Sequence, residues 1–227
     1  MNEMSVNTVL PMYELTAFMK SRANFTLYHL LAAKNASFIA TEIENKYKSE
    51  SPSQKERDIY LSQVSTAIIC SVAALESNIN EYLVDHEKHL PGTSVNFDKK
   101  VIKKYPHLNK GLPSLSQYLL RSTCIIFKYD IVWFIVKKDL LPENKLKQDI
   151  RYLTRLRNAL MHFTPEWDDA LSKHVDLEKG RKNRFKMNPF YRTGSLFFPY
   201  VCLSASCARW SYRITNEFIA LFKAEIR

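Results

Sequence analysis

Apolar residues recur every three or four positions along most of this chain, which is the period of helices that bury one face. A first helix is predicted over residues 25–47. Its expected buried positions follow that spacing and are Ala32, Ala36, Ile39, Ile43 and Tyr47. The chain breaks at 51–53, and a second helix is predicted to begin there because Ser53 and Glu56 have the spacing of a capping box.

The second predicted helix is long and ends near residue 88, before a Leu-Pro-Gly sequence. Its apolar stripe is typical of a core helix in a bundle and comprises Leu61, Val64, Ile68, Val72, Leu75, Ile79 and Tyr82 or Leu83. Glu76 lies at the edge of this stripe. A carboxylate in that position is either a counter-ion for an arginine from another helix or a boundary residue whose head reaches water.

Three more helices are predicted, over residues 115–138, 143–166 and 201–223. The core face of the last one is expected to comprise Ala208, Ile214, Phe218, Leu221 and Phe222. The fold class is therefore all-α: a bundle of about five helices with long antiparallel core helices and a polar insertion before the last helix. We expect a single domain over 1–227, with residues 1–20 only loosely attached to it.

Two connections are rich in basic residues. The connection at 91–113 contains five lysines and has room for one short helical turn near 98–104. The connection at 167–199 contains the run KGRKNRFK over 179–186, which is the densest basic stretch in the chain. Such a run is typical of a loop that contacts RNA, and it is equally typical of a solvated insertion.

The helix predicted over 143–166 carries one residue that its pattern does not explain. At about 100° per residue, the apolar side chains share one face, and Arg157 falls in the middle of it. A permanent charge on a core face is costly unless it is paired or used. A second, polar stripe on the same helix consists of Arg151, Arg155, Asn158 and His162.

Composition narrows the function classes. The 227 residues carry a net charge of +10, which favours a polyanionic partner such as RNA. None of the four cysteines forms a CxxC pair, and no membrane span or secretory signal is evident, so a reduced, cytoplasmic protein without membrane attachment is expected. The chain has no glycine-rich phosphate loop and no HExxH or GxSxG motif, and no cofactor or metal is expected.

Arg157, Asn158 and His162 are sufficient in kind for cleavage of RNA without a metal. A ribose 2′-hydroxyl can attack the adjacent phosphate while a histidine moves the proton. A guanidinium can bind the non-bridging phosphate oxygens as charge develops on them. In a regular helix, however, Arg157 and His162 point about 140° apart. They can act on one phosphate only if the helix end is distorted or a second chain contributes.

The sequence RNALMH at 157–162 resembles the R-x4–6-H signature of the HEPN superfamily, in which the residue after the arginine is polar and often Asn. The segments ALESNINEY at 74–82 and CARW at 207–210 are similar to the acidic and C-terminal helices of bacterial members. The resemblance implies a helical bundle, a homodimer, and a ribonuclease site where the two motif helices meet. It also implies that Arg157 and His162 are catalytic and that Asn158 and Glu76 support them.

Two function classes remain open on the sequence, beside a basic helical domain in which the motif is present by coincidence. The first is a metal-independent endoribonuclease of a toxin or phage-defence system, with an antitoxin or a companion defence subunit as a further partner. The second is a HEPN-like dimer that binds RNA or a nucleotide, or serves as an assembly scaffold, without cleaving. In both, the residues expected to contact RNA are Arg151, Arg155, Lys179, Arg181, Lys182, Arg184 and Lys186.

Overall fold

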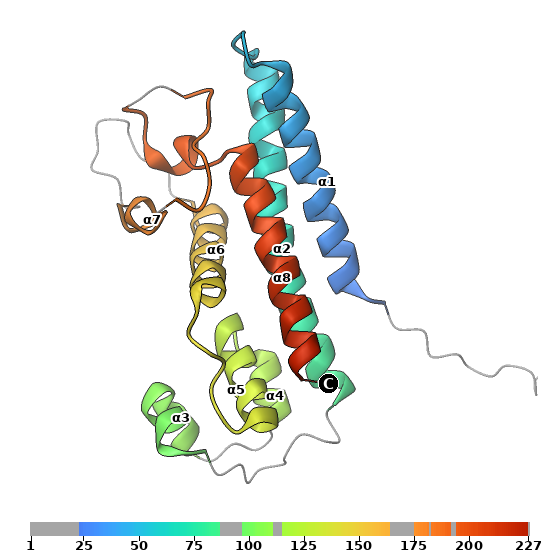
Figure 1. Ribbon diagram of the computed structural model, residues 1–227, viewed down its shortest axis with the longest axis vertical. Helices are drawn as coiled ribbons and strands as arrows, with labels where there is room; N and C mark the ends of the chain where they lie inside the picture. Colours follow the sequence, from blue (N-terminus) through green and yellow to red (C-terminus); the bar gives the residue numbers. More distant parts are fainter. Residues whose placement is uncertain are drawn as a thin grey trace, which may run out of the picture.

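The computed structural model describes residues 23–86, 97–110, 115–163, 175–181, 183–191 and 194–226. The described part is helical and contains no β-strand, as expected. The loose attachment predicted for residues 1–20 falls outside it. Helices α1 (Phe25–Lys46), α2 (Gln54–Asp85) and α8 (Ala205–Glu225) run along the long axis of the molecule (Figure 1).

The middle layer is formed by α2 and α8, which run in the same direction. Near the start of both helices, the Ala205 N–H donates to the Tyr60 hydroxyl at 2.8 Å. Near their ends, the rings of Tyr82 and Phe222 lie 6.1 Å apart. Helix α1 is antiparallel to both and packs on one side of this layer, while α6 (Lys145–Met161) packs on the other (Figure 1).

The capping box predicted at the start of α2 is confirmed. The Ser53 hydroxyl accepts the backbone N–H of Glu56, and the Glu56 carboxylate accepts the backbone N–H of Ser53. The predicted apolar stripe of α2 is also confirmed, since Val64, Ile68, Val72, Leu75 and Ile79 are all buried. Within the described residues α2 is the one helix long and apolar enough to cross a membrane, a test that the core helix of a soluble bundle also passes.

The predicted buried face of α1 is right only in part. Ala36 is buried and Ile43 packs against the core as predicted, but the other buried residues of α1 are small ones that the pattern did not indicate: Thr26, Ala33, Ser37 and Ala40. Small side chains let two helix backbones approach closely. They therefore occupy most of the face of α1 that packs against α2 and α8, although larger apolar residues are available in the helix. Ile39, which the pattern assigned to the core, is 41% exposed.

The single helix predicted over 115–138 is two helices, α4 (Leu115–Arg121) and α5 (Ile125–Lys137). The chain leaves the helix at Ser122, whose hydroxyl accepts the backbone N–H of Cys124 at 3.3 Å. Serine and threonine side chains offer the backbone such local alternatives to helical hydrogen bonds. The short helical turn expected near 98–104 is present as α3 (Lys99–Lys104), capped by Asp98, and a 3₁₀ turn (Pro106–Lys110) follows it.

The polar connection before the last helix contains structure that the sequence pattern did not indicate. Helix α7 (Val175–Gly180) packs on α6, and the Tyr152 hydroxyl donates to the backbone carbonyl of Leu177 at 2.9 Å. A π-helical turn (Phe197–Val201) buries Phe197 and Phe198 just before α8. The described part of this connection is therefore packed against the bundle.

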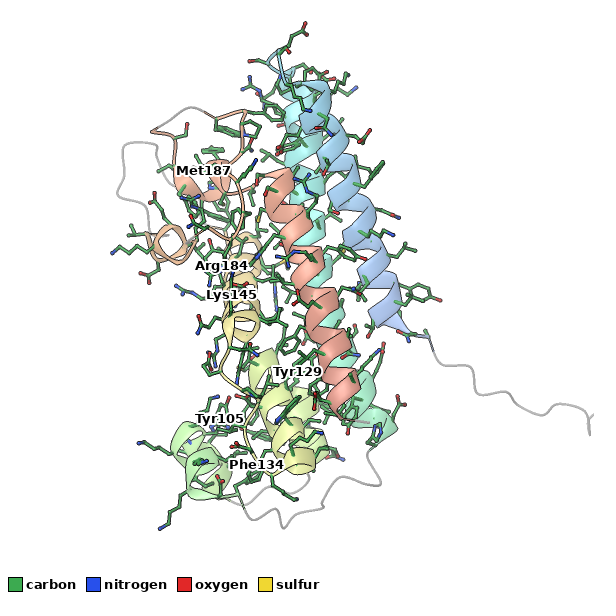
Figure 2. All side chains as sticks on the ribbon, in the orientation of Figure 1. Tyr105, Tyr129, Phe134, Lys145, Arg184 and Met187 are labelled. Atoms are coloured by element: carbon green, nitrogen blue, oxygen red, sulfur yellow. The ribbon has the colours of Figure 1, made fainter. Side chains whose placement is uncertain are left out.

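A charge cluster inside the protein holds α3, α5 and α6 together. The fully buried Asp130 of α5 accepts from Lys147 of α6 at 2.7 Å, and from Lys104 of α3 and the Tyr105 hydroxyl at 2.6 Å each. Burial lowers the pKa of Lys147, and its hydrogen bond to Asp130 opposes that shift. Burial and the hydrogen bond to Asp130 raise the pKa of Tyr105, so its hydroxyl stays protonated and donates. Tyr105 lies beside the lower half of the bundle in Figure 2.

We predict that Asp130→Asn destabilises the fold by about 3 kcal/mol, because it leaves the buried ammonium of Lys147 with only the half-exposed carboxylate of Glu143, 3.8 Å away, as a compensating charge. Urea denaturation at neutral pH measures this. The matched control is Asp139→Asn, which removes the exposed pair of Asp139 and Lys100 at 3.8 Å and should cost less than about 1 kcal/mol. Equal losses in the two variants would contradict the proposed role of Asp130.

Candidate ribonuclease site on helix α6

Helix α6 positions the motif residues through its apolar face. The Asn144 side chain caps the helix by accepting the Lys147 N–H at 2.9 Å. Ile150, Leu153 and Leu156 are fully buried. This face packs against α2 and α8, so the direction in which each motif side chain points is set by the core.

Arg157 lies on this buried face, as its spacing predicts, and is itself half-buried. Its Nε is buried and has no hydrogen-bond partner. Among the described residues, no carboxylate forms an ion pair with its guanidinium. An unsatisfied buried donor on a charged group costs free energy that a bound anion would recover.

His162 is the C-cap residue of α6, and its side chain is exposed. Its backbone N–H still donates to the Asn158 carbonyl at 3.0 Å, so the helical hydrogen bonds reach this residue, while its own φ of −113° and ψ of 34° are those of the helix end. The helical period therefore applies: His162 and Asn158 point about 40° apart, on an exposed face, and Arg157 points about 140° from His162. Within one chain, the geometry separates the predicted binding group from the predicted proton-transfer group.

Glu76 does not contact Arg157. Its carboxylate lies 3.9 Å from the ammonium of Lys128 on α5. Lys128 is fully buried and donates to the Asn80 side chain at 2.9 Å, and burial lowers its pKa. Because the buried lysine attracts Glu76 to α5, the counter-ion predicted for Arg157 is wrong. The supporting role assigned to Glu76 has no geometric basis in one chain.

Two of the predicted RNA contacts are surface arginines in weak ion pairs. Arg151 pairs with Glu143, and both side chains are partly exposed. Arg155 lies 3.7 Å from Asp176 of α7, and these two side chains are more than half exposed. Exposed pairs of this kind contribute little to stability, so either arginine can exchange its carboxylate for a phosphate. Together with Asn158 and His162 they form an exposed polar face along α6.

Arg184 is different, because its guanidinium is committed to contacts inside the molecule. Its Nε donates to Asp149 of α6 at 2.7 Å, its Nη1 donates to the Gly180 carbonyl, and the group lies 4.9 Å from the centre of the Tyr152 ring. Figure 2 shows Arg184 beside α6. We therefore assign Arg184 to the attachment of the basic connection rather than to RNA.

The other basic residues predicted to contact RNA make no described contact with Arg157, Asn158 or His162. Lys179 and Lys186 are exposed, Arg181 is half-buried, and Lys182 lies outside the described residues. No cluster of three or more potential metal-ligating side chains occurs in the described part of the chain. The four cysteines are free thiols, of which Cys202 and Cys207 are buried.

A cavity of about 1170 Å³, whose lining contains none of the motif residues, lies between the α1–α2 turn and residues 189–191 and 195. Its lining includes Glu44, Arg57 and Tyr191, which the sequence analysis did not single out. Glu44 accepts from the Tyr60 hydroxyl at 2.7 Å and from the N–H of Ala205 at the start of α8 at 3.1 Å. This arrangement is explained by helix capping, and no sequence pattern marks it as a ligand site.

No protein-family model matches the chain, and the searches of curated proteins and of solved structures gave no match. The likeness to the HEPN superfamily therefore depends on the motif residues and on the helical class of the fold.

We predict that Arg184→Ala destabilises the protein by about 3 kcal/mol, since it leaves the largely buried Asp149 without its partner. Arg155→Ala is the matched control on the same surface, and it should change stability by less than about 1 kcal/mol. Thermal denaturation with both variants checks this. A fully stable Arg184→Ala protein would return Arg184 to the set of candidate RNA contacts.

Proposed function

We propose that this protein is a metal-independent endoribonuclease whose active site forms between two copies of helix α6. The observation that carries the proposal is the guanidinium of Arg157, held on a core face with a buried Nε that has no acceptor. Asn158 and His162 lie exposed within five residues of it on the same helix. A toxin or phage-defence setting in the cytoplasm, with an antitoxin or companion subunit, belongs to the same proposal.

The chemistry follows from these three side chains. His162 takes the proton of the ribose 2′-hydroxyl, whose oxygen then attacks the adjacent phosphorus. The bond from phosphorus to the 5′-oxygen of the next nucleotide breaks, and the proton that His162 took passes to this leaving oxygen, directly or through water, so the products carry a 2′,3′-cyclic phosphate and a 5′-hydroxyl. Arg157 binds the non-bridging oxygens as their charge increases, and the Asn158 amide contributes a further hydrogen bond.

A second chain is required because one chain separates the two key groups. With α6 regular to its end, Arg157 and His162 point about 140° apart. In a symmetric dimer, Arg157 of one chain and His162 of the other can face one phosphate, and the symmetry produces two such sites. Met161 and Phe163, both exposed apolar residues beside His162, are suitable surface for that contact.

The same divergence favours a second candidate. If α6 does not pair in this way, Arg157 and the exposed arginines of α6 still provide cationic groups for phosphate, but no proton transfer accompanies them. The protein would then bind RNA without cleaving it, as a dimer or an assembly scaffold.

We predict that Arg157→Ala and His162→Ala each reduce RNA cleavage by about 100-fold or more. The assay uses single-stranded RNA in EDTA, with the cyclic phosphate product detected by mass spectrometry. Lys145→Ala is the control, because it removes an exposed cation from the same helix that belongs neither to the motif nor to the candidate RNA contacts. Arg157→Lys keeps the charge and the apolar stem, so it tests the guanidinium if Arg157→Ala fails to fold.

Mixing the two inactive variants tests the shared site directly. A dimer of one Arg157→Ala chain and one His162→Ala chain has one intact site and one empty site if each site draws on both chains. Random mixing should then restore about one quarter of wild-type activity. No recovery despite subunit exchange would place both groups in one chain. An RNA-binding wild-type protein that never cleaves would favour the second candidate.

A further inference from the structure

Helix α1 presents an apolar face to solvent that none of the described helices covers. Its large apolar side chains on that face are between 41% and 63% exposed and are Leu27, Tyr28, Leu31, Phe38 and Ile39, with Phe25 at the start of the helix. At the helical period, the first five fall within about 120° of one another. Among the described helices, α1 packs mainly against α2 and α8 (Figure 1).

This face is a consequence of how α1 is attached. The buried side chains of its inner face are alanine, serine and threonine, and of its large apolar residues Leu30 and Ile43 pack against the core. Most of the large apolar residues of α1 are therefore on the outside, the reverse of a helix that ends a monomeric bundle. Large contiguous apolar surface of this kind marks a site of protein contact.

Charge indicates the kind of partner. Between Leu27 and Glu42, the polar residues on this face are Lys34, Asn35 and Glu42, one of each charge and one neutral. The chain as a whole carries a net charge of +10, yet this face is balanced. A balanced apolar face offers no attraction to RNA or to an anionic membrane, so a protein helix is the occupant that it fits.

We propose that the occupant is α1 of a second copy of this chain, packed antiparallel about a two-fold axis. If Tyr28 lies opposite Phe38 of the second copy, the same register places Leu27 opposite Ile39 and Leu31 opposite Asn35. Glu42 then lies beside Asn24, the N-cap of the other α1, where the helix dipole favours a negative charge. One register therefore matches the apolar pairs and the acidic residue together.

The exposed apolar surface of α1 is large enough for an interface between two copies. Six large side chains exposed to this extent present roughly 600 Å² of surface on each copy, to which the interspersed polar stems add. A stable interface needs about 800 Å² per partner. Two copies of a 22-residue helix can reach this value. The contact is isologous and closes after two copies.

This interface does not depend on the proposed ribonuclease activity. Helices α1 and α6 lie on opposite sides of the layer formed by α2 and α8 (Figure 1). Pairing through α1 therefore keeps the two motif helices apart. An active site shared between chains would need a second, separate contact at α6.

Sedimentation equilibrium of the full-length chain at tens of micromolar tests the proposal. Phe38→Asp and Leu31→Asp should each reduce the mass of the assembly to half or less, with unchanged circular dichroism. Met187→Asp places the same charge on an exposed apolar residue elsewhere and should leave the mass unchanged. A monomeric wild type, or an assembly that Phe38→Asp leaves intact, would overturn the proposal.

Cross-linking tests the register. In a chain with Cys70 and Cys124 replaced by serine, Tyr28→Cys combined with Phe38→Cys should form a disulfide-linked dimer on mild oxidation. Tyr28→Cys combined with Lys34→Cys should not, because position 34 lies four residues away from position 38, which the register places opposite Tyr28. Arg157→Ala should leave the cross-linking unchanged, which separates this contact from the proposed active site. Efficient cross-linking of the control pair alone would refute the antiparallel register.

Discussion

The fold depends on the buried carboxylate of Asp130. It accepts hydrogen bonds from Lys104, Tyr105 and Lys147, and thereby joins α3, α5 and α6. Charges at this depth are expensive to desolvate, and only a complete set of partners offsets that cost. Lys147 lies in the first turn of α6, so the cluster positions the N-terminal end of the motif helix. The rest of α6 follows, since its apolar face packs against α2 and α8.

Against this background, the surroundings of Arg157 are unusual. The buried lysines Lys128 and Lys147 have acceptors close to their ammonium groups, and Arg184 has Asp149. Arg157 has a buried Nε without an acceptor. Among the described residues of α6, it has the one buried side-chain nitrogen or oxygen that lacks a hydrogen-bond partner. A protein that pairs its other buried cations so consistently has the means to pair this one. An open coordination position is what a site for an anionic ligand requires.

The sequence predicted what local patterns determine. The capping box of α2, its long apolar stripe and the position of Arg157 on the buried face of α6 depend on spacing within one helix, and each is present. The failures concern choices between elements. Which face of α1 turns inward depends on how closely α2 and α8 allow a backbone to approach. The partner of Glu76 is Lys128, which belongs to α5. The sequence of α5 is so apolar that its pattern does not indicate an ion pair at this lysine. The direction of His162 relative to Arg157 was predictable, because it depends on helical period alone.

Two features of the molecule call for a second chain, and they lie on opposite sides of the bundle. The divergence of Arg157 and His162 requires a partner at the end of α6 if catalysis occurs, and the exposed apolar face of α1 requires a partner at the other edge (Figure 1). One two-fold axis cannot satisfy both. If both contacts form, each is isologous, and the smallest closed assembly that contains both has four copies. Catalysis and assembly would then be separable properties of this fold, because different helices carry them.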